Sequence, residues 1–151
     1  HIAEYYFDRG SIYYAIARFQ EAIEDFNESI ELDPGLTVAY NNRGLAWVQQ
    51  GQFQLAIDDF DLVISQDPLF ALGFNNRGFA YRELGEYESA IQDLDRAIEM
   101  VPKLGIAYYN RAVAHAGLRQ DSEAELDGRR AVELGIDPTV VLRGIDAAKN
   151  R

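Results

Sequence analysis

The sequence contains no cysteine, which excludes disulfide bonds and metal sites built from thiolates. Histidine occurs only at His1, where we expect a disordered end, and at His115, so neither a His-based catalytic triad nor a cluster of His metal ligands can be assembled. The glycines form no phosphate-binding loop, and no acidic segment has the glycine-turn spacing of a calcium loop. The sequence therefore predicts no catalytic residue, no metal and no cofactor.

Basic residues and long apolar runs are also scarce. The 14 lysines and arginines stand against 25 aspartates and glutamates, and the net charge of −11 argues against a nucleic-acid partner, which needs clustered positive charge. No apolar run approaches the roughly 18 residues of a membrane span, and no signal segment opens the chain. We expect a soluble protein without membrane insertion, its compartment unknown but the cytoplasm favoured. Because the first residue is His1 rather than Met, we also expect a piece of a longer protein or a processed chain.

One short pattern returns every 34 residues. The segment YNNRGLAW at 40–47 recurs as FNNRGFAY at 74–81 and as YYNRAVAH at 108–115, and the same step backwards reaches YFDRGSIY at 6–13. Each copy is followed by an alanine, then mostly by a bulky residue four positions on and by a proline; these are Ala22, Ala56, Ala90, Ala124, then Phe26, Phe60, Leu94, then Pro34, Pro68 and Pro102. A fixed period of this length indicates a repeat architecture.

These aromatic, glycine, alanine and proline positions resemble the tetratricopeptide repeat over nearly the whole chain. The resemblance implies an all-α fold, a right-handed α-solenoid of four helix-turn-helix repeats plus a C-terminal capping helix. We expect one domain over residues 1–151. Its repeats should cover about 3–36, 37–70, 71–104 and 105–137, with the capping helix at about 138–149.

Helical spacing of apolar residues, interrupted by glycine and ended by proline, places two helices in each repeat. The first, or A, helices are expected at about 3–16, 37–50, 71–84 and 105–118, and the second, or B, helices at about 20–32, 54–66, 88–100 and 122–134. Asp137 followed by Pro138 is a typical start for the capping helix.

Two further patterns predict how A and B helices meet. Small residues at Gly10, Gly44, Gly78 and Ala112 should let each A helix approach its B helix closely. The arginine just before each of them has an aspartate 16 residues later, which suggests a contact in every repeat; the pairs are Arg9–Asp25, Arg43–Asp59, Arg77–Asp93 and Arg111–Asp127. The alternative, two unrelated surface charges, stays open; a contact that forms is expected to be an exposed pair worth about 0.2–1 kcal/mol.

The two ends of the chain depart from the repeat pattern. Tyr5 and Ile12 replace the small residues on which a preceding repeat would pack, so we expect an exposed apolar edge that favours self-association. Gly128 replaces the bulky residue of the last repeat and should make room for the capping helix.

The resemblance implies that the A helices line a concave groove. Asn42, Asn76 and Asn110 occupy one equivalent position, and an Asn amide matches the C=O and N–H of an extended peptide. Such a ladder could hold a peptide backbone, while apolar neighbours accept its side chains. The alternative, that these amides bond only within the array or to water, stays open. Besides the three amides, the candidate peptide-binding residues are Asp8, Tyr14, Val38, Asn41, Leu45, Leu72, Asn75, Phe79, Arg82, Ile106, Tyr109 and Val113.

A carboxylate clamp, known in the family for holding acidic chaperone tails, is not predicted, because its basic positions hold Glu4, Val38, Leu72 and Ile106 and only Arg82 is basic. The leading hypothesis is therefore a noncatalytic scaffold for a protein or peptide partner. Two alternatives are a homo-oligomeric assembly module that uses the Tyr5 and Ile12 edge, and a targeting module of a longer enzyme.

Overall fold

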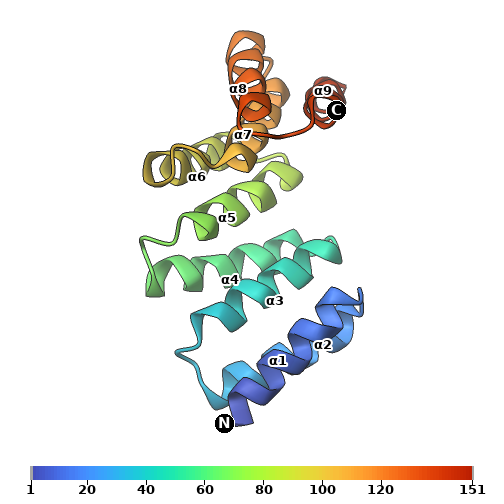
Figure 1. Ribbon diagram of the computed structural model, residues 1–151, viewed down its shortest axis with the longest axis vertical. Coiled ribbons are helices and arrows are strands. Elements are labelled where there is room, and N and C mark those ends of the chain that lie inside the picture. Colours follow the sequence, from blue (N-terminus) through green and yellow to red (C-terminus); the bar gives the residue numbers. More distant parts are fainter. Residues whose placement is uncertain (1, 151) are drawn as a thin grey trace. The chain divides into compact units, whose positions relative to one another are not determined.

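The computed structural model describes residues 2–150, and these residues form nine α-helices and no strand (Figure 1). The helices are α1 (Ile2–Ala15), α2 (Phe19–Leu32), α3 (Thr37–Gln49), α4 (Phe53–Gln66), α5 (Ala71–Leu84), α6 (Tyr87–Met100), α7 (Gly105–Gly117), α8 (Asp121–Glu133) and α9 (Pro138–Lys149). Every predicted helix is present, with both ends within one residue of the expected position. The all-α series of paired helices and a final single helix is confirmed.

The chain divides into two compact units, one that ends at Gly73 and one that begins at Phe74. The division falls in the first turn of α5. The expected single domain over residues 1–151 stays a prediction.

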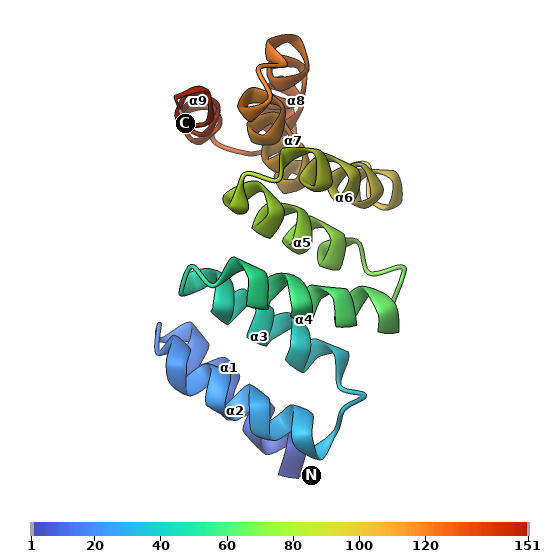
Figure 2. The same cartoon turned by 180° about the vertical axis from the view of Figure 1, so that it is seen from behind.

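In the first unit, α1 lies beside α2 and α3 beside α4, and both opposite views show these pairs (Figures 1 and 2). The A and B helices meet at the predicted glycines. A Cβ atom on Gly44 would lie 2.7 Å from Cε1 of Phe60, and one on Gly10 would lie 2.9 Å from Cε1 of Phe26. Both phenylalanines are completely buried. The glycine in each pair therefore makes the space that the aromatic ring fills.

In the second unit, α6 packs against α7 and α7 against α8. A Cβ atom on Gly78 would lie 2.9 Å from Cγ of Leu94, so the close approach persists with a leucine in place of the ring. In the last repeat, a Cβ atom on Gly128 would lie 3.2 Å from both Val141 and Ile145 of α9. As predicted, Gly128 makes room for the capping helix.

The start of α9 is fixed by Asp137. Its Oδ1 accepts hydrogen bonds from the backbone N–H groups of Thr139, at 2.7 Å, and Val140, at 3.4 Å, as the predicted N-cap should. Hydrogen bonds from the Thr139 side chain and from these two N–H groups lower the pKa of Asp137. The capping helix α9 packs more against α7 than against α8.

The turns between A and B helices share one backbone feature. The residue with positive φ recurs every 34 residues, as Ala17 (60°), Gly51 (71°), Gly85 (82°) and Arg119 (60°). Glycine adopts this left-handed conformation without penalty, whereas a residue with a Cβ atom pays about 1–2 kcal/mol. The first and last turns are therefore strained relative to the middle two.

We predict that Arg119→Gly raises the free energy of unfolding by roughly 0.5–1 kcal/mol. The strain relieved is partly offset by the greater entropy of glycine in the unfolded chain. Urea denaturation checks this. The matched variant Gly51→Ala should lose about 1 kcal/mol through the backbone alone, because no atom lies within 4 Å of the added Cβ. Equal stability of Arg119→Gly and the parent chain would contradict the account.

Candidate functional site

The predicted arginine–aspartate pairs form in all four repeats. In each, the arginine on the A helix donates through Nε and Nη2 to the two carboxylate oxygens of the aspartate on the B helix, at distances from 2.5 to 2.9 Å. The expectation that these pairs are exposed was wrong, since the aspartates are only 3–6% accessible. The close helix approach encloses the carboxylate. These are bidentate pairs in which a buried carboxylate meets a guanidinium that is 19–41% exposed.

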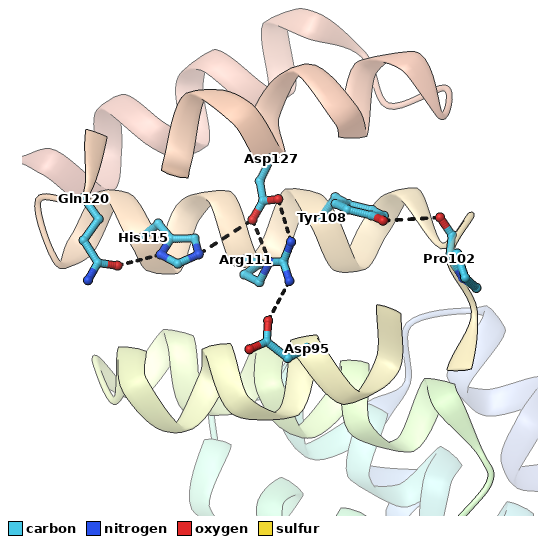
Figure 3. Close-up of polar contacts among 7 residues, drawn as sticks. All are labelled: Asp95, Pro102, Tyr108, Arg111, His115, Gln120 and Asp127. Carbon is cyan, nitrogen blue, oxygen red and sulfur yellow. Dashed lines mark hydrogen bonds and ion pairs between the residues drawn. The ribbon is translucent and has the colours of Figure 1, made fainter. Parts of the chain in front are cut away.

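Arg43 and Arg111 also bind the B helix of the preceding repeat. Arg43 donates through Nη1 to Oδ1 of Asn27, at 2.8 Å. Arg111 donates through Nη1 to Oδ1 of Asp95, at 2.6 Å, so that Figure 3 shows its guanidinium between Asp95 on α6 and Asp127 on α8. The hydrogen bonds with Asp127, and then with Asp95, raise the pKa of Arg111 against the effect of its burial. Each of these two arginines therefore joins three helices.

Burial changes the titration of one aspartate. Loss of solvent raises the pKa of Asp59, and the neighbouring Asp58 acts in the same direction, while the hydrogen bonds from Arg43 oppose the rise. The hydrogen bonds from Arg43 thus favour the ionised form of the Asp59 carboxylate, against the effect of burial. The pair of Arg43 and Asp59 joins α3 to α4. By helical spacing, Arg43 therefore lies on the side of α3 opposite the candidate groove residues.

His115, in the same region as Arg111, is half-buried on α7, as predicted. Its Nδ1 lies 2.6 Å from Oε1 of Gln120, and its Nε2 lies 3.7 Å from Oδ2 of Asp127 (Figure 3). Both neighbours hold the ring against its own helix pair. The second histidine of the sequence, His1, lies outside the described residues.

The first unit brings three candidate residues together. Tyr14 on α1 and Asn42 and Leu45 on α3 line a hollow of about 90 Å³ with Ser11. Asn42 is half-buried, and its Oδ1 accepts a hydrogen bond from Nδ2 of Asn41 at 3.2 Å. In the part of the chain that the structure describes, Nδ2 of Asn42 has no acceptor. This amide can donate to a ligand.

The remaining candidates of the groove differ in exposure. Val38, Leu72 and Ile106 share one position of the repeat and are 49%, 44% and 38% exposed, which is high for large apolar side chains. Asp8 is exposed, while Asn41, Asn76 and Phe79 are half-buried. Asn76 accepts a hydrogen bond from Nδ2 of Asn75 at 3.2 Å.

Asn110, in the second unit, is buried, whereas we expected its amide to face the groove. Asn110 is 1% exposed, its Oδ1 accepts from Nη1 of Arg82 at 2.9 Å, and its Nδ2 donates to Oδ1 of Asn75 at 3.1 Å. Asn75 and Arg82 are likewise buried, at 5% and 6% exposure. The three side chains form an internal network, so the amide of Asn110 is not offered at the surface. A role for Asn110 in holding a peptide stays a prediction.

The capping helix covers two more candidates. Tyr109 and Val113 line a cavity of about 200 Å³ with Arg82 and with Gly144, Ala147 and Ala148 of α9. A Cβ atom on Gly144 would lie 2.6 Å from the hydroxyl of Tyr109. The sequence analysis predicted that α9 caps the last repeat, but it placed Tyr109 and Val113 in the groove and missed that α9 covers them. A glycine inside a predicted helix was the available signal, because it often marks a close approach.

The first helix carries the predicted apolar edge. Ile2, Tyr5, Ile12 and Ile16 at α1 are 57–68% exposed and lie on one face by their helical spacing.

Among the described residues, no cluster of three His, Asp or Glu side chains could hold a metal ion. None of the described helices combines the length and apolar character needed to cross a bilayer.

Two family models match this sequence. One described as "Tetratricopeptide repeat" matches residues 3–36, and one described as "TPR repeat" matches residues 80–118. No curated protein gives a significant match.

Solved structures of the same architecture are similar over most of the chain. A crystal structure of MamA is 26% identical, with a TM-score of 0.81 over 87% of this chain and 77% of its own. The first TPR of Spaghetti (RPAP3), bound to the HSP90 peptide SRMEEVD, is 24% identical, with a TM-score of 0.76 over 78% of this chain and 94% of its own. TTC0263, a thermophilic TPR protein of Thermus thermophilus, is 18% identical, with a TM-score of 0.83 over 99% of this chain and 84% of its own. These similarities confirm the α-solenoid class.

We predict that Arg43→Ala lowers the free energy of unfolding by about 3 kcal/mol, because the carboxylate of Asp59 is left buried without its partner. Chemical denaturation measures the loss. Arg18, whose pair with Glu21 is half exposed, provides the control, and Arg18→Ala should change stability little. The double variant Arg43→Met with Asp59→Leu should recover most of the loss. A loss for Arg43→Ala no larger than that for Arg18→Ala would show that burial adds nothing to the pair.

Proposed function

The chain belongs to the tetratricopeptide-repeat family, and on this basis we propose that it is a noncatalytic scaffold that binds an extended, partly apolar peptide along its A helices. Proteins of this family typically mediate protein–protein interactions. The RPAP3 domain, similar in fold, is one whose structure includes a bound peptide. The proposal for this chain depends on the chemistry of its own A helices.

The unused Nδ2 donor of Asn42 is the observation that supports the proposal most directly. Its Nδ2 has no acceptor among the described residues and lies beside the hollow formed with Tyr14 and Leu45. Val38 precedes Asn42 by four residues and Leu45 follows it by three, so the three side chains share one face of α3. This face offers an amide donor between two apolar side chains.

An extended peptide is complementary to that face. Its backbone C=O groups accept hydrogen bonds, and its side chains point alternately to opposite sides. A carbonyl can accept from Asn42 while a neighbouring apolar side chain packs on Val38, which is half exposed. Val38 in place of a basic residue, and the exposed Glu4, disfavour acidic tails such as SRMEEVD.

The three asparagines do not contribute equally in this proposal. Asn42 acts first, because its amide is available. A peptide could bond to Asn110 only by replacing its bonds to Asn75 and Arg82. We therefore expect Asn110→Ala to alter the stability of the second unit as well as any affinity, whereas Asn42→Ala, which loses one hydrogen bond from Asn41, should act mainly on affinity.

We predict that Asn42→Ala weakens peptide binding roughly 2- to 13-fold, the loss of one hydrogen bond. The probe is a peptide selected on the whole chain from a displayed random dodecapeptide library, and fluorescence anisotropy measures its affinity. Asn150→Ala, which removes an exposed asparagine at the end of α9, is the matched control. SRMEEVD should bind more weakly than the selected peptide. Unchanged affinity in both Asn42→Ala and the triple Asn42, Asn76, Asn110 alanine variant would refute the amide mechanism.

A second candidate function is homo-oligomeric assembly, which the exposed side chains of Ile2, Tyr5, Ile12 and Ile16 favour. We predict that Ile12→Lys shifts the chain towards the monomer, because it places a charge in the apolar edge. Light scattering over a dilution series measures the mass. A parent chain that is monomeric at every concentration rules this candidate out. A role as the targeting module of a longer enzyme is decided by the full-length reading frame.

A further inference from the structure

The cavity under α9 has the size of one side chain. Its volume of about 200 Å³ is below the range of about 300–1,000 Å³ typical of sites for drug-sized ligands. Arg82, Glu83 and Tyr87 form one part of its wall, Tyr109 and Val113 another, and the small residues of α9 the third. Gly144 brings α9 against the ring of Tyr109, since any side chain there would lie within 3 Å of it.

The wall is rich in hydrogen-bond donors that the protein does not use. Arg82 has five N–H groups, of which three are engaged: one with Asn110 at 2.9 Å and two with Oε1 of Glu83 at 2.6 and 3.1 Å. The other two have no acceptor among the described residues. Within the same described range, the hydroxyls of Tyr87 and Tyr109 have no hydrogen-bond partner. A ligand that fits must therefore offer acceptors.

Arg82 is also held in place. Its guanidinium lies 4.5 Å from the centre of the Phe79 ring and 5.7 Å from that of Tyr109, and the residue is only 6% exposed. Stacking and burial fix the direction of its N–H groups before any ligand arrives. A site prepared in this way loses little conformational entropy on binding.

The charge of the wall selects among acceptors. Glu83 lies 2.6 Å from Nη2 of Arg82 and balances its charge, so the pair donates hydrogen bonds without offering net positive charge. A carboxylate in the cavity would be repelled by Glu83, whereas a carbonyl oxygen is neutral and can accept two hydrogen bonds. An aliphatic side chain would leave the donors of Arg82 unpaired, which is costly in a buried site.

We propose that this cavity is a subsite for a primary carboxamide, the side-chain group of glutamine or asparagine, with Arg82 and Tyr109 as the donors to its oxygen. The inference deepens the proposed function and rests on it, because it assigns a residue class to a peptide held on the A helices.

The test uses small probes on the whole chain and needs no peptide ligand. The probes are the N-acetyl, N′-methylamide derivatives of glutamine, glutamate and methionine, which share one backbone and have similar side-chain lengths. Nuclear magnetic resonance titration follows the Nε–H signal of Arg82, assigned with Arg82→Lys, and the backbone amide of Gly144. The glutamine derivative should shift both signals and bind about tenfold more tightly than either of the other two.

A pair of tyrosine variants separates the subsite from a general effect of mutation. Tyr109→Phe removes one hydroxyl and keeps the ring against Gly144, so circular dichroism should show an unchanged fold. It should weaken the glutamine derivative about threefold or more and leave the methionine derivative unaffected. Tyr108→Phe is the control, since the hydroxyl of Tyr108 bonds to the carbonyl of Pro102, outside the cavity.

Three results would overturn the inference: equal affinities for the three derivatives, tighter binding of the glutamate derivative, or no shift at Arg82 and Gly144 with any probe. An equal loss in Tyr108→Phe would also overturn it. The proposed function is measured separately, by peptide binding and its dependence on Asn42 in the first unit. Failure of the subsite with that dependence intact would remove only the subsite.

Discussion

The contact between a glycine on the A helix and a large side chain on the B helix, present in the first three repeats, is the constraint on which the structure depends. Gly44 and Phe60 illustrate it, because a single added carbon would overlap the ring. Arg43 and Asp59 are the residues immediately before these two, so the same contact sets them opposite one another and encloses the carboxylate. Packing thus decides the charge pairing, and the pairing in turn fixes how the helices are rotated.

That rotation determines which residues remain for a partner. With Arg43 and Gly44 turned towards α4, the opposite face of α3 presents Val38, Asn42 and Leu45. In α7 of the second unit the equivalent face is covered. Asn110 is hydrogen-bonded to Arg82, and Tyr109 and Val113 lie against α9. One repeated sequence pattern therefore yields an open amide in one unit and a lined cavity in the other.

Helix ends, the arginine–aspartate pairs, the exposed Tyr5 edge and the role of Gly128 were all predictable, since each depends on spacing within or between adjacent repeats. The burial of the aspartates was not, because a spacing of 16 residues gives a contact but not its depth. The bonds of Asn110 depend on Arg82, one repeat earlier, whose inward direction no periodicity reveals. The positive φ of Arg119 was hidden because its turn lacks the glycine that marks the middle turns.

The replacement of an aromatic ring by Gly128 has a consequence for how such a chain can grow. Val141 and Ile145 of α9 occupy the space beside Gly128, so the last hairpin receives its filling from a segment that follows it instead of from its own B helix. That hairpin stays incomplete until the chain has been synthesised through Ile145. Lengthening the array by inserting another repeat after α8 would separate the two and leave a void that only a bulky residue in place of Gly128 could close.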